Sequence, residues 1–236
     1  MLRRLPVEKM GESNLGWLRS KFHFSFAEYY NEKNINFGVL RVINDDYIAP
    51  GTGFPTHPHR DMEIISYVIE GKLTHKDSMG NESTLERGEV QYMSAGTGVT
   101  HSEYNKHAED TRILQIWVLP DRKGHTPNYG EYKFKYEDRI GKWLHFVSSK
   151  EGDAPIKVNQ DVNFYVTEIE AGKEMEFEVK EGSQAYVVQI EGKSEINSTA
   201  MNPRDGLETI GESLKIAALE KSHILVIEMK EREDLK

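Results

Sequence analysis

Short β-type segments separated by turn residues recur along the chain, and this pattern limits the fold more than any other feature of the sequence. The segments include "FGVLRVIND", "EIISYVIEG", "GEVQYMSAG", "RILQIWVLP", "NFYVTEIEAG" and "HILVIEM". They are rich in β-branched and aromatic residues, and many end at Gly, Asn or Asp, which tolerate the positive φ of tight turns. Many short strands with regular turn signals are typical of β-sandwiches and barrels. The 236-residue chain is therefore predicted to be all-β, with length for one large domain or two small ones.

The two halves of the chain resemble each other. The segment "YVIEGKLTH" is similar to "VVQIEGKSEI", and this aligns Gly71 with Gly192. Two similar β units of roughly 100 residues fit the usual size of a domain. The polar stretch from Leu119 to Lys133 contains Pro and Gly, and it is a candidate linker between them.

Two pairs of metal-ligand residue types stand in the first half. His57 and His59 form one pair, and His101 and Glu103 form the other, each spaced i and i+2. Residues two apart on a strand point to the same face, about 6–7 Å from each other. An isolated HxH is usually a surface coincidence, but here each pair follows a Gly-rich turn, "PGTGFPTH" or "SAGTGVTH". Two strands facing one barrel interior would thus make a site of three histidines and one carboxylate.

The chemistry of these ligands limits the metal and its place in the chain. The chain has no cysteine, so thiolate ligands are excluded. Three imidazoles and a carboxylate suit Fe, Mn, Co, Ni, Cu or Zn better than Mg or Ca. On the alignment of the halves, His57 and His59 correspond to Glu178 and Lys180. Only the first half is therefore predicted to hold a histidine-rich metal site.

The other histidines are expected to be structural, because none has a second ligand at a useful spacing. They are His23, His75, His107, His125, His145 and His223. The net charge of −9 and the pI near 5.5 argue against nucleic-acid or anionic-membrane partners. No apolar run approaches the length of a membrane span. These features predict a soluble, cytoplasmic protein.

The segments around the histidines resemble the pirin family of the cupin superfamily. The general cupin first motif, G-x5-H-x-H-x3,4-E-x6-G, is matched at Gly51, His57, His59 and Glu63, with Gly71 one residue late. In the second motif, Ser94 stands where Pro is usual and His101 comes two residues late. These departures are similar to those of pirins, as are "GTGFPTHPHRDMEI", "DSMGN" and "MSAGTGVTHSEYN".

This resemblance implies a bicupin, with two β-barrel (jelly-roll) domains in tandem. Residues 1–130 would form the N-terminal metal-binding cupin domain, and residues 131–236 a C-terminal degenerate cupin domain without metal ligands. In pirins the fourth ligand is the glutamate two residues after the last histidine, so the expected ligands are His57, His59, His101 and Glu103. Most cupins instead use the glutamate of the first motif, here Glu63, which we expect to orient a histidine or to line the pocket.

The resemblance also implies an activity. Pirins of the quercetinase type (quercetin 2,3-dioxygenase-like) open the heterocycle of a flavonol with O2 and release carbon monoxide. One divalent transition metal per chain is expected, iron foremost, with Zn, Mn, Co, Ni or Cu as alternatives. Glu103 would be the catalytic base that accepts the flavonol hydroxyl proton. Other pirins are metal-dependent binding proteins that modulate a transcription factor or an enzyme, so a non-enzymatic regulator with a protein partner is the alternative.

Overall fold

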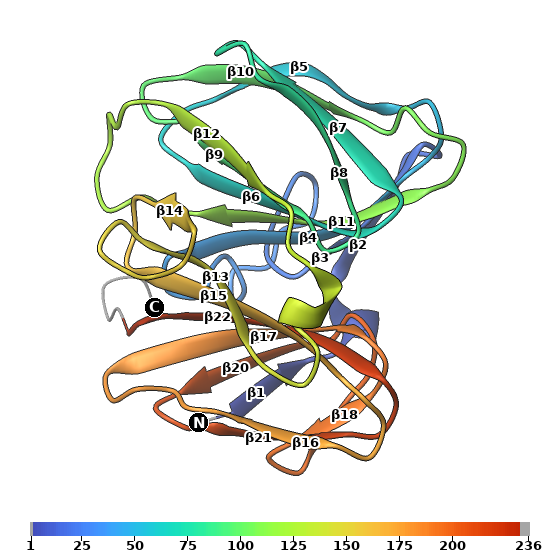
Figure 1. The fold of residues 1–236 in the computed structure, drawn as a ribbon, viewed down its shortest axis with the longest axis vertical. Coiled ribbons are helices and arrows are strands. Elements are labelled where there is room, and N and C mark those ends of the chain that lie inside the picture. Colours follow the sequence, from blue (N-terminus) through green and yellow to red (C-terminus); the bar gives the residue numbers. More distant parts are fainter. Residues whose placement is uncertain (1, 232–236) are drawn as a thin grey trace. The chain divides into compact units, whose positions relative to one another are not determined.

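Two units, each built from two β-sheets, make up the part of the chain that the computed structural model describes, residues 2–231 (Figure 1). The prediction of an all-β chain with two cupin barrels is thus confirmed. The helical elements among these residues are two three-residue turns, η1 (Val7–Lys9) and η2 (Tyr136–Asp138). Within the same residues, no helix has the length and apolarity needed to cross a lipid bilayer.

The N-terminal unit comprises residues 11–134 and 158–160. Its strands are β2 (Gly11–Asn14), β3 (Leu18–Phe22), β4 (Leu40–Ile48), β5 (Gly53–His59), β6 (Glu63–Glu70), β7 (Lys72–Asp77), β8 (Glu82–Glu86), β9 (Val90–Ser94), β10 (Val99–Tyr104), β11 (Thr111–Val118) and β12 (Asn128–Tyr132). One sheet has the order β12-β9-β6-β11-β4-β3-β2, and the other has the order β5-β10-β7-β8. Figure 1 shows β5, β10, β7 and β8 as a layer over β9, β6 and β11.

The interior of the N-terminal unit holds both apolar and polar side chains. One apolar cluster consists of Leu18, Ile48, Val68, Leu73, Leu85 and Ile113, and a smaller one of Ile64, Met93 and Val99. Burying each large aliphatic side chain contributes about 1.5–3 kcal/mol, so these clusters stabilise the barrel. Polar residues are also buried in this unit, among them Ser66, His75, Gln91, His101, Glu103 and Gln115.

The C-terminal unit comprises residues 2–10, 135–157 and 161–231 of the described chain. Its strands are β1 (Leu2–Leu5), β13 (Leu144–Ser149), β14 (Ile156–Val158), β15 (Val162–Ile169), β16 (Glu174–Phe177), β17 (Ser183–Glu191), β18 (Ser194–Ile196), β19 (Thr199–Met201), β20 (Gly206–Ile210), β21 (Leu214–Ala218) and β22 (Ser222–Lys230). The sheets have the orders β1-β20-β17-β22-β15-β13-β14 and β16-β21-β18-β19. Thirteen buried residues, all apolar, form the core cluster of this unit.

The units do not divide at a single point between residues 130 and 131, where the sequence predicts the boundary. β1 pairs with β20, so the first strand of the chain belongs to the C-terminal unit. Residues 158–160 belong to the N-terminal unit. The predicted linker Leu119 to Lys133 contains β12, which pairs with β9 over five residues. Met1 and residues 232–236, at the outer ends of the predicted domains, lie outside the described residues.

The internal repeat is present in the topology. Gly71 joins β6 to β7 and Gly192 joins β17 to β18, with φ of 69° and 71°. A Cβ at Gly71 would collide with the carbonyl oxygen of Asp110, and one at Gly192 with the carbonyl oxygen of Lys221. Both positions therefore need glycine for the same two reasons, a positive φ and a close approach of the chain before the next central strand.

Candidate metal centre

Strand pairing between β5 and β10 brings the two predicted ligand pairs together. His57 lies opposite His101, and His59 lies opposite Val99. Burial alternates along β10, so His101 and Glu103 face inward while Thr100 is exposed. The register shifts between His101 and Glu103, which lies opposite Phe54, because a β-bulge places one extra residue of β5 at this point.

The three histidines converge on one point. One ring nitrogen from each of His57, His59 and His101 lies within 4.8 Å of the corresponding nitrogens of the others. The Nε2 atoms of His57 and His101 are 3.1 Å apart. The Nδ1 atom of His57 is 2.7 Å from the carbonyl oxygen of Pro55, to which only an N–H can donate. The proton of His57 is therefore on Nδ1, and its Nε2 lone pair faces His101.

The electrostatics keep the imidazoles of His59 and His101 neutral. Burial, followed by the neighbouring His101 and His57, lowers the pKa of His59 to about 4. Burial, followed by the neighbouring His57 and His75, lowers the pKa of His101 to about 3. Neutral imidazole is the form that donates a lone pair to a metal, so at pH 7 the site has little competition from protons.

The arrangement fits a transition metal. Two imidazole nitrogens bound to one metal at about 2.0–2.1 Å lie roughly 3.0–3.4 Å apart, depending on the coordination angle. The 3.1 Å between the Nε2 atoms of His57 and His101 falls in that range. The donor set of imidazole nitrogens with a nearby carboxylate suits Fe, Mn, Co, Ni, Cu or Zn.

Glu103 lies next to His101 and is held by neutral donors. Its Oε1 atom accepts hydrogen bonds from Ser66 Oγ at 2.9 Å and from Gln91 Nε2. Its Oε2 atom accepts one from Gln115 Nε2 at 2.7 Å. A carboxylate oxygen within 4.8 Å of nitrogens of His75 and His101 makes Glu103 part of a second potential ligand group. Glu103 is therefore beside the metal centre, but it does not lie within that distance of all three predicted histidine ligands.

Glu63 lies elsewhere in the N-terminal unit. Its carboxylate accepts hydrogen bonds from Ser94 Oγ at 2.7 Å, from Asn159 N at 3.0 Å and from Asn159 Nδ2 at 3.1 Å. These bonds join the start of β6 to residues 158–160. Among the described residues, Glu63 thus contacts Ser94 and Asn159, and no contact with His57, His59 or His101 is found.

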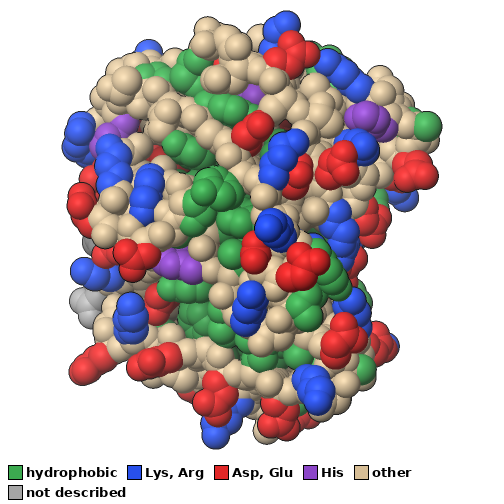
Figure 2. All heavy atoms as spheres, in the orientation of Figure 1, with side chains coloured by type: hydrophobic (Ala, Val, Ile, Leu, Met, Phe, Trp, Pro, Cys, Tyr) green, Lys and Arg blue, Asp and Glu red, His purple; other side chains and the backbone are tan. Residues whose placement is uncertain are grey.

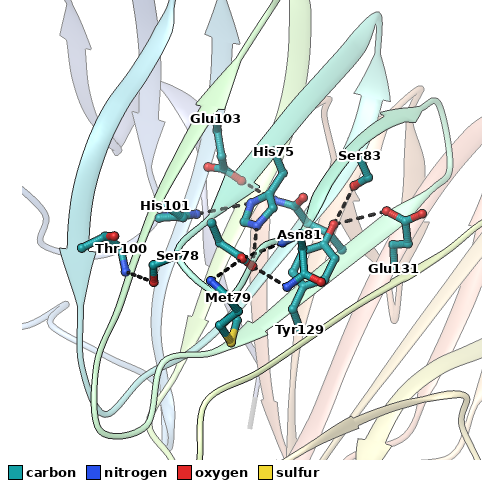
Figure 3. Close-up of polar contacts among 12 residues, drawn as sticks. His75, Ser78, Met79, Asn81, Ser83, Thr100, His101, Glu103, Tyr129 and Glu131 are labelled. Atoms are coloured by element: carbon teal, nitrogen blue, oxygen red, sulfur yellow. Dashed lines mark hydrogen bonds and ion pairs between the residues drawn. The ribbon is translucent and has the colours of Figure 1, made fainter.

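The expectation that His75 has no partner ligand is wrong. His75 is completely buried on β7, and its Nδ1 atom is 3.5 Å from Nδ1 of His101. Its Nε2 atom is 3.2 Å from Oδ2 of Asp77. The sequence did carry a signal, because Asp77 follows His75 at the same i, i+2 spacing as the two recognised pairs. Figure 3 shows His75 between His101 and Tyr129.

A hollow lies beside His59, and Trp117, which contacts the same histidine, carries an unpaired donor. The hollow has a volume of about 480 Å³ and is lined by residues in and next to β5 and β10 and by Ser78 of the β7–β8 turn: Pro58, His59, Arg60, Ser78, Gly98, Val99 and Thr100. Trp117 packs edge-on against His59, with ring centroids 5.0 Å apart. The buried Nε1–H of Trp117 finds no acceptor among the described residues, so it is available to a ligand oxygen.

Acidic and basic side chains are interspersed on the visible face of the molecule (Figure 2). This mixture accords with the acidic net charge of −9. A continuous basic surface is the electrostatic mark of a nucleic-acid-binding protein, and this face does not have one.

Comparison with known families and proteins connects this geometry to a function. The family description "Pirin" matches residues 5–118, and "Quercetinase C-terminal cupin domain" matches residues 145–229. A Pseudomonas aeruginosa protein, provisionally named quercetin 2,3-dioxygenase, is 46% identical over 97% of this chain and 100% of its own. An Escherichia coli protein named quercetin 2,3-dioxygenase is 39% identical over 97% of this chain and 99% of its own. The crystal structure of the bacterial pirin YhhW from Escherichia coli in complex with nickel(II) superposes with a TM-score of 0.92 at 36% identity, covering 98% of this chain and 100% of that chain.

Proposed function

This chain belongs to the pirin family, and on that premise we propose that it is a metal-dependent dioxygenase of the quercetinase type, acting on a flavonol and O2. The observation that supports the proposal most directly is the convergence of His57, His59 and His101 at nitrogen separations suited to one metal. The net reaction converts one flavonol and one O2 into a ring-opened phenolic ester and one carbon monoxide.

The metal, for which we propose iron, would act as a Lewis acid toward the flavonol 3-hydroxyl and would allow electron transfer from the flavonol to O2. His57, His59 and His101 would hold it in one place. The hydrogen bond from His57 Nδ1 to the carbonyl oxygen of Pro55 keeps that ring in the tautomer and orientation needed for ligation. We place this activity in the cytoplasm.

The carboxylate of Glu103 has one lone-pair site left for a further hydrogen bond or a metal. A carboxylate offers about four lone-pair sites. Ser66, Gln91 and Gln115 occupy three of them, two on Oε1 and one on Oε2. The remaining site on Oε2 would take the proton of the flavonol 3-hydroxyl or a position on the metal. Because these donors fix the carboxylate beside His101, Glu103 is positioned to accept that proton, whereas a bond to the metal would require it to move toward the three histidines.

The surroundings of the histidines suit a small aromatic substrate. A volume of about 480 Å³ lies within the usual range of ligand pockets. The Nε1–H of Trp117 would donate to an oxygen of the bound flavonol, and its indole ring offers a flat apolar surface.

The test is turnover by protein of known metal content. Metal-free protein would be loaded separately with Fe, Mn, Co, Ni, Cu and Zn, and loss of quercetin and formation of carbon monoxide followed under air. We expect equal amounts of quercetin lost and carbon monoxide formed, and neither without metal or without O2. The absence of turnover with all six metals, in protein shown to be loaded, would favour the alternative, a metal-binding regulator that acts through a protein partner.

A further inference from the structure

His75 and Asp77 form a buried chain of hydrogen bonds that ends on His101, and we propose that this chain fixes the tautomer of His101 so that its Nε2 lone pair faces the metal. His75 and Asp77 are thus positioning residues. The inference rests on the proposed metal site, but it does not depend on which reaction occurs there.

The series of hydrogen bonds begins at Asp77, whose carboxylate has all of its acceptor sites filled. Its Oδ1 atom accepts hydrogen bonds from the backbone N–H groups of Met79 at 2.9 Å and Asn81 at 3.0 Å. Its Oδ2 atom accepts one from Asn81 Nδ2 at 2.9 Å and lies 3.2 Å from His75 Nε2. The side chains of His75 and Asp77 are both fully buried, so water does not compete for these contacts.

With both histidines neutral, one arrangement of protons satisfies the whole series of hydrogen bonds. A carboxylate can only accept, so His75 must donate its Nε2–H to Asp77. Neutral His75 then has a lone pair on Nδ1, which faces Nδ1 of His101 at 3.5 Å, the long end of a hydrogen bond. His101 must in turn carry its proton on Nδ1. Its Nε2 atom, 3.1 Å from Nε2 of His57, is left with a lone pair for the metal.

The ring of His75 is held in this orientation from its flat side as well. Tyr129 of β12 stacks on it with ring centroids 4.6 Å apart and an interplanar angle of 15°. The hydroxyl of Tyr129 is in turn hydrogen-bonded to Ser83 at 2.6 Å (Figure 3). A ring fixed by stacking and by Asp77 cannot turn to offer a different nitrogen to His101.

A second arrangement of the same residues is the alternative to exclude. Ligand atoms of His75, His101 and Glu103 lie within 4.8 Å of one another, which would also suit a metal between the two Nδ1 atoms. Three of the lone-pair sites of Glu103 are already used, and the fourth is assigned above to the flavonol proton or to the metal of the three histidines, so none is left for a second metal. We therefore favour a proton between the Nδ1 atoms over a second metal.

Three substitutions separate the tautomer effect from simple packing. His75→Leu removes the acceptor for His101. In Asp77→Asn the two backbone donors hold the amide oxygen, so the amide NH2 takes the place of Oδ2 and loses the hydrogen bond from Asn81 Nδ2. The same NH2 group faces His75 Nε2 and forces the proton of His75 onto Nδ1. Donor then faces donor at His101, although the shape is unchanged. His75→Asn restores an acceptor, because its Oδ1 occupies the place of Nδ1 in the histidine.

The measurements use zinc(II), because it is diamagnetic. We expect the dissociation constant for zinc, measured by competition with a chelator, to rise about 10–100-fold in His75→Leu and Asp77→Asn. The dissociation constant of His75→Asn should stay within about threefold of that of the unsubstituted chain, because both have an acceptor at the same position. ¹⁵N spectra of the zinc-loaded protein should show the proton of His101 on Nδ1. His223→Gln breaks a comparable buried histidine–carboxylate contact in the C-terminal unit, 3.0 Å from Nδ1 to Glu191 Oε2, and should leave zinc affinity unchanged.

Unchanged zinc affinity in both His75→Leu and Asp77→Asn would overturn the proposal, as would a proton of His101 on Nε2 in a metal-free chain that binds zinc normally. Anomalous scattering from a metal between His75 and His101 would also overturn it, because His75 would then be a ligand. If His75→Leu fails to fold, the contrast between Asp77→Asn and His75→Asn decides. Both readouts concern zinc and proton position, so a lack of flavonol turnover would count against the proposed function alone.

Discussion

The two barrels have the same strand order, but polar side chains in the interior of the N-terminal barrel are replaced by apolar ones in the C-terminal barrel. With Gly71 and Gly192 aligned, the registers of β7 with β10 and of β18 with β21 give a position-by-position comparison. Four interior polar residues of the N-terminal barrel, His57, His75, His101 and Glu103, correspond to Phe177, Ile196, Leu214 and Ile216. All four of the latter lie in the apolar core of the C-terminal barrel.

The contrast extends to the groups that hold Glu103. Both central strands carry a register shift at the same place, beside Ile69 in β6 and Ile190 in β17. The three residues that donate to the carboxylate, Ser66, Gln91 and Gln115, then correspond to Val187, Leu207 and Val226. The carboxylate and its donors are thus replaced together, which avoids a buried polar group without a partner.

This difference teaches that the barrel does not need its polar interior in order to fold. Apolar residues fill the same positions in the C-terminal barrel and give it a continuous core. Polar groups in the N-terminal barrel are stabilising only as a complete network, since each would otherwise cost about 1–3 kcal/mol when buried. The correspondence also replaces the sequence-based alignment of His57 with Glu178, because the register places Phe177 opposite Leu214 in the equivalent pair.

The largest effect that would sharpen this comparison is expected from Glu103→Ala. It removes the carboxylate that the C-terminal barrel replaces with Ile216, and we expect metal loss on dialysis and a fall in turnover of at least about 100-fold. Glu63→Ala should keep most of its metal, because the bonds of Glu63 go to Ser94 and Asn159. Metal content after dialysis checks both variants, and the opposite pattern would assign the fourth ligand to Glu63.

The comparison also predicts one metal per chain. The potential ligand groups among the described residues all lie in the N-terminal unit. Elemental analysis should give one equivalent of metal per chain. His101→Leu introduces the residue found at the equivalent position of the C-terminal barrel, Leu214, and should reduce the metal content to a small fraction of one equivalent. Two equivalents, or metal held by His145 or His223, would break the distinction between the barrels.

The reverse exchange tests the stability of the C-terminal barrel. Leu214→His places an imidazole in an apolar core without a hydrogen-bond partner, so we expect the free energy of unfolding of that unit to fall by about 3 kcal/mol. His101→Leu in metal-free protein should cost less, about 1 kcal/mol, because it leaves only the long 3.5 Å contact of His75 Nδ1 without its partner. Urea unfolding measures both, and equal destabilisation by the two variants would contradict the comparison.

The smallest expected effect is on pH dependence. In metal-free protein His59 and His101 have pKa values of about 4 and about 3, below the value of about 6.5 in an unfolded chain. Between these limits the unfolded state binds more protons, so stability falls as pH drops below 6.5. We expect a loss of about 2 kcal/mol from pH 7 to pH 5, allowing for the partial exposure of His59.

A double variant, His59→Asn with His101→Asn, provides the control for that measurement. It should flatten the decline of the free energy of unfolding between pH 7 and pH 5, followed by urea titration without metal. Burial also lowers the pKa of His145 in the C-terminal barrel, so some slope should remain. An unchanged slope would mean that neither histidine of the metal centre is linked to stability.

Local patterns were enough to predict the strands and the convergence of the three histidines. The i, i+2 spacing places His57 and His59 on one face whatever the strand pairs with, and His101 was grouped with them on the expectation that both strands face one barrel interior. The role of His75 could not, because its contact with His101 depends on the register of β7 against β10. The separation of Glu63 from the histidines likewise depends on residues 158–160, nearly 100 positions away.

The assignment of β1 to the C-terminal barrel also could not be predicted from local sequence patterns. It has a consequence for folding during synthesis. Arg3 and Glu208, which are paired side chains of β1 and β20, are 205 positions apart. At typical translation rates of about 5–20 residues per second, β1 leaves the ribosome roughly 10–40 s before β20 exists. The metal-binding barrel can close while the nascent chain is still growing, but the edge of β20 stays bare until β1, which was made earlier, returns to cover it. A fusion partner or a bound chaperone next to β1 would therefore delay maturation of the C-terminal barrel.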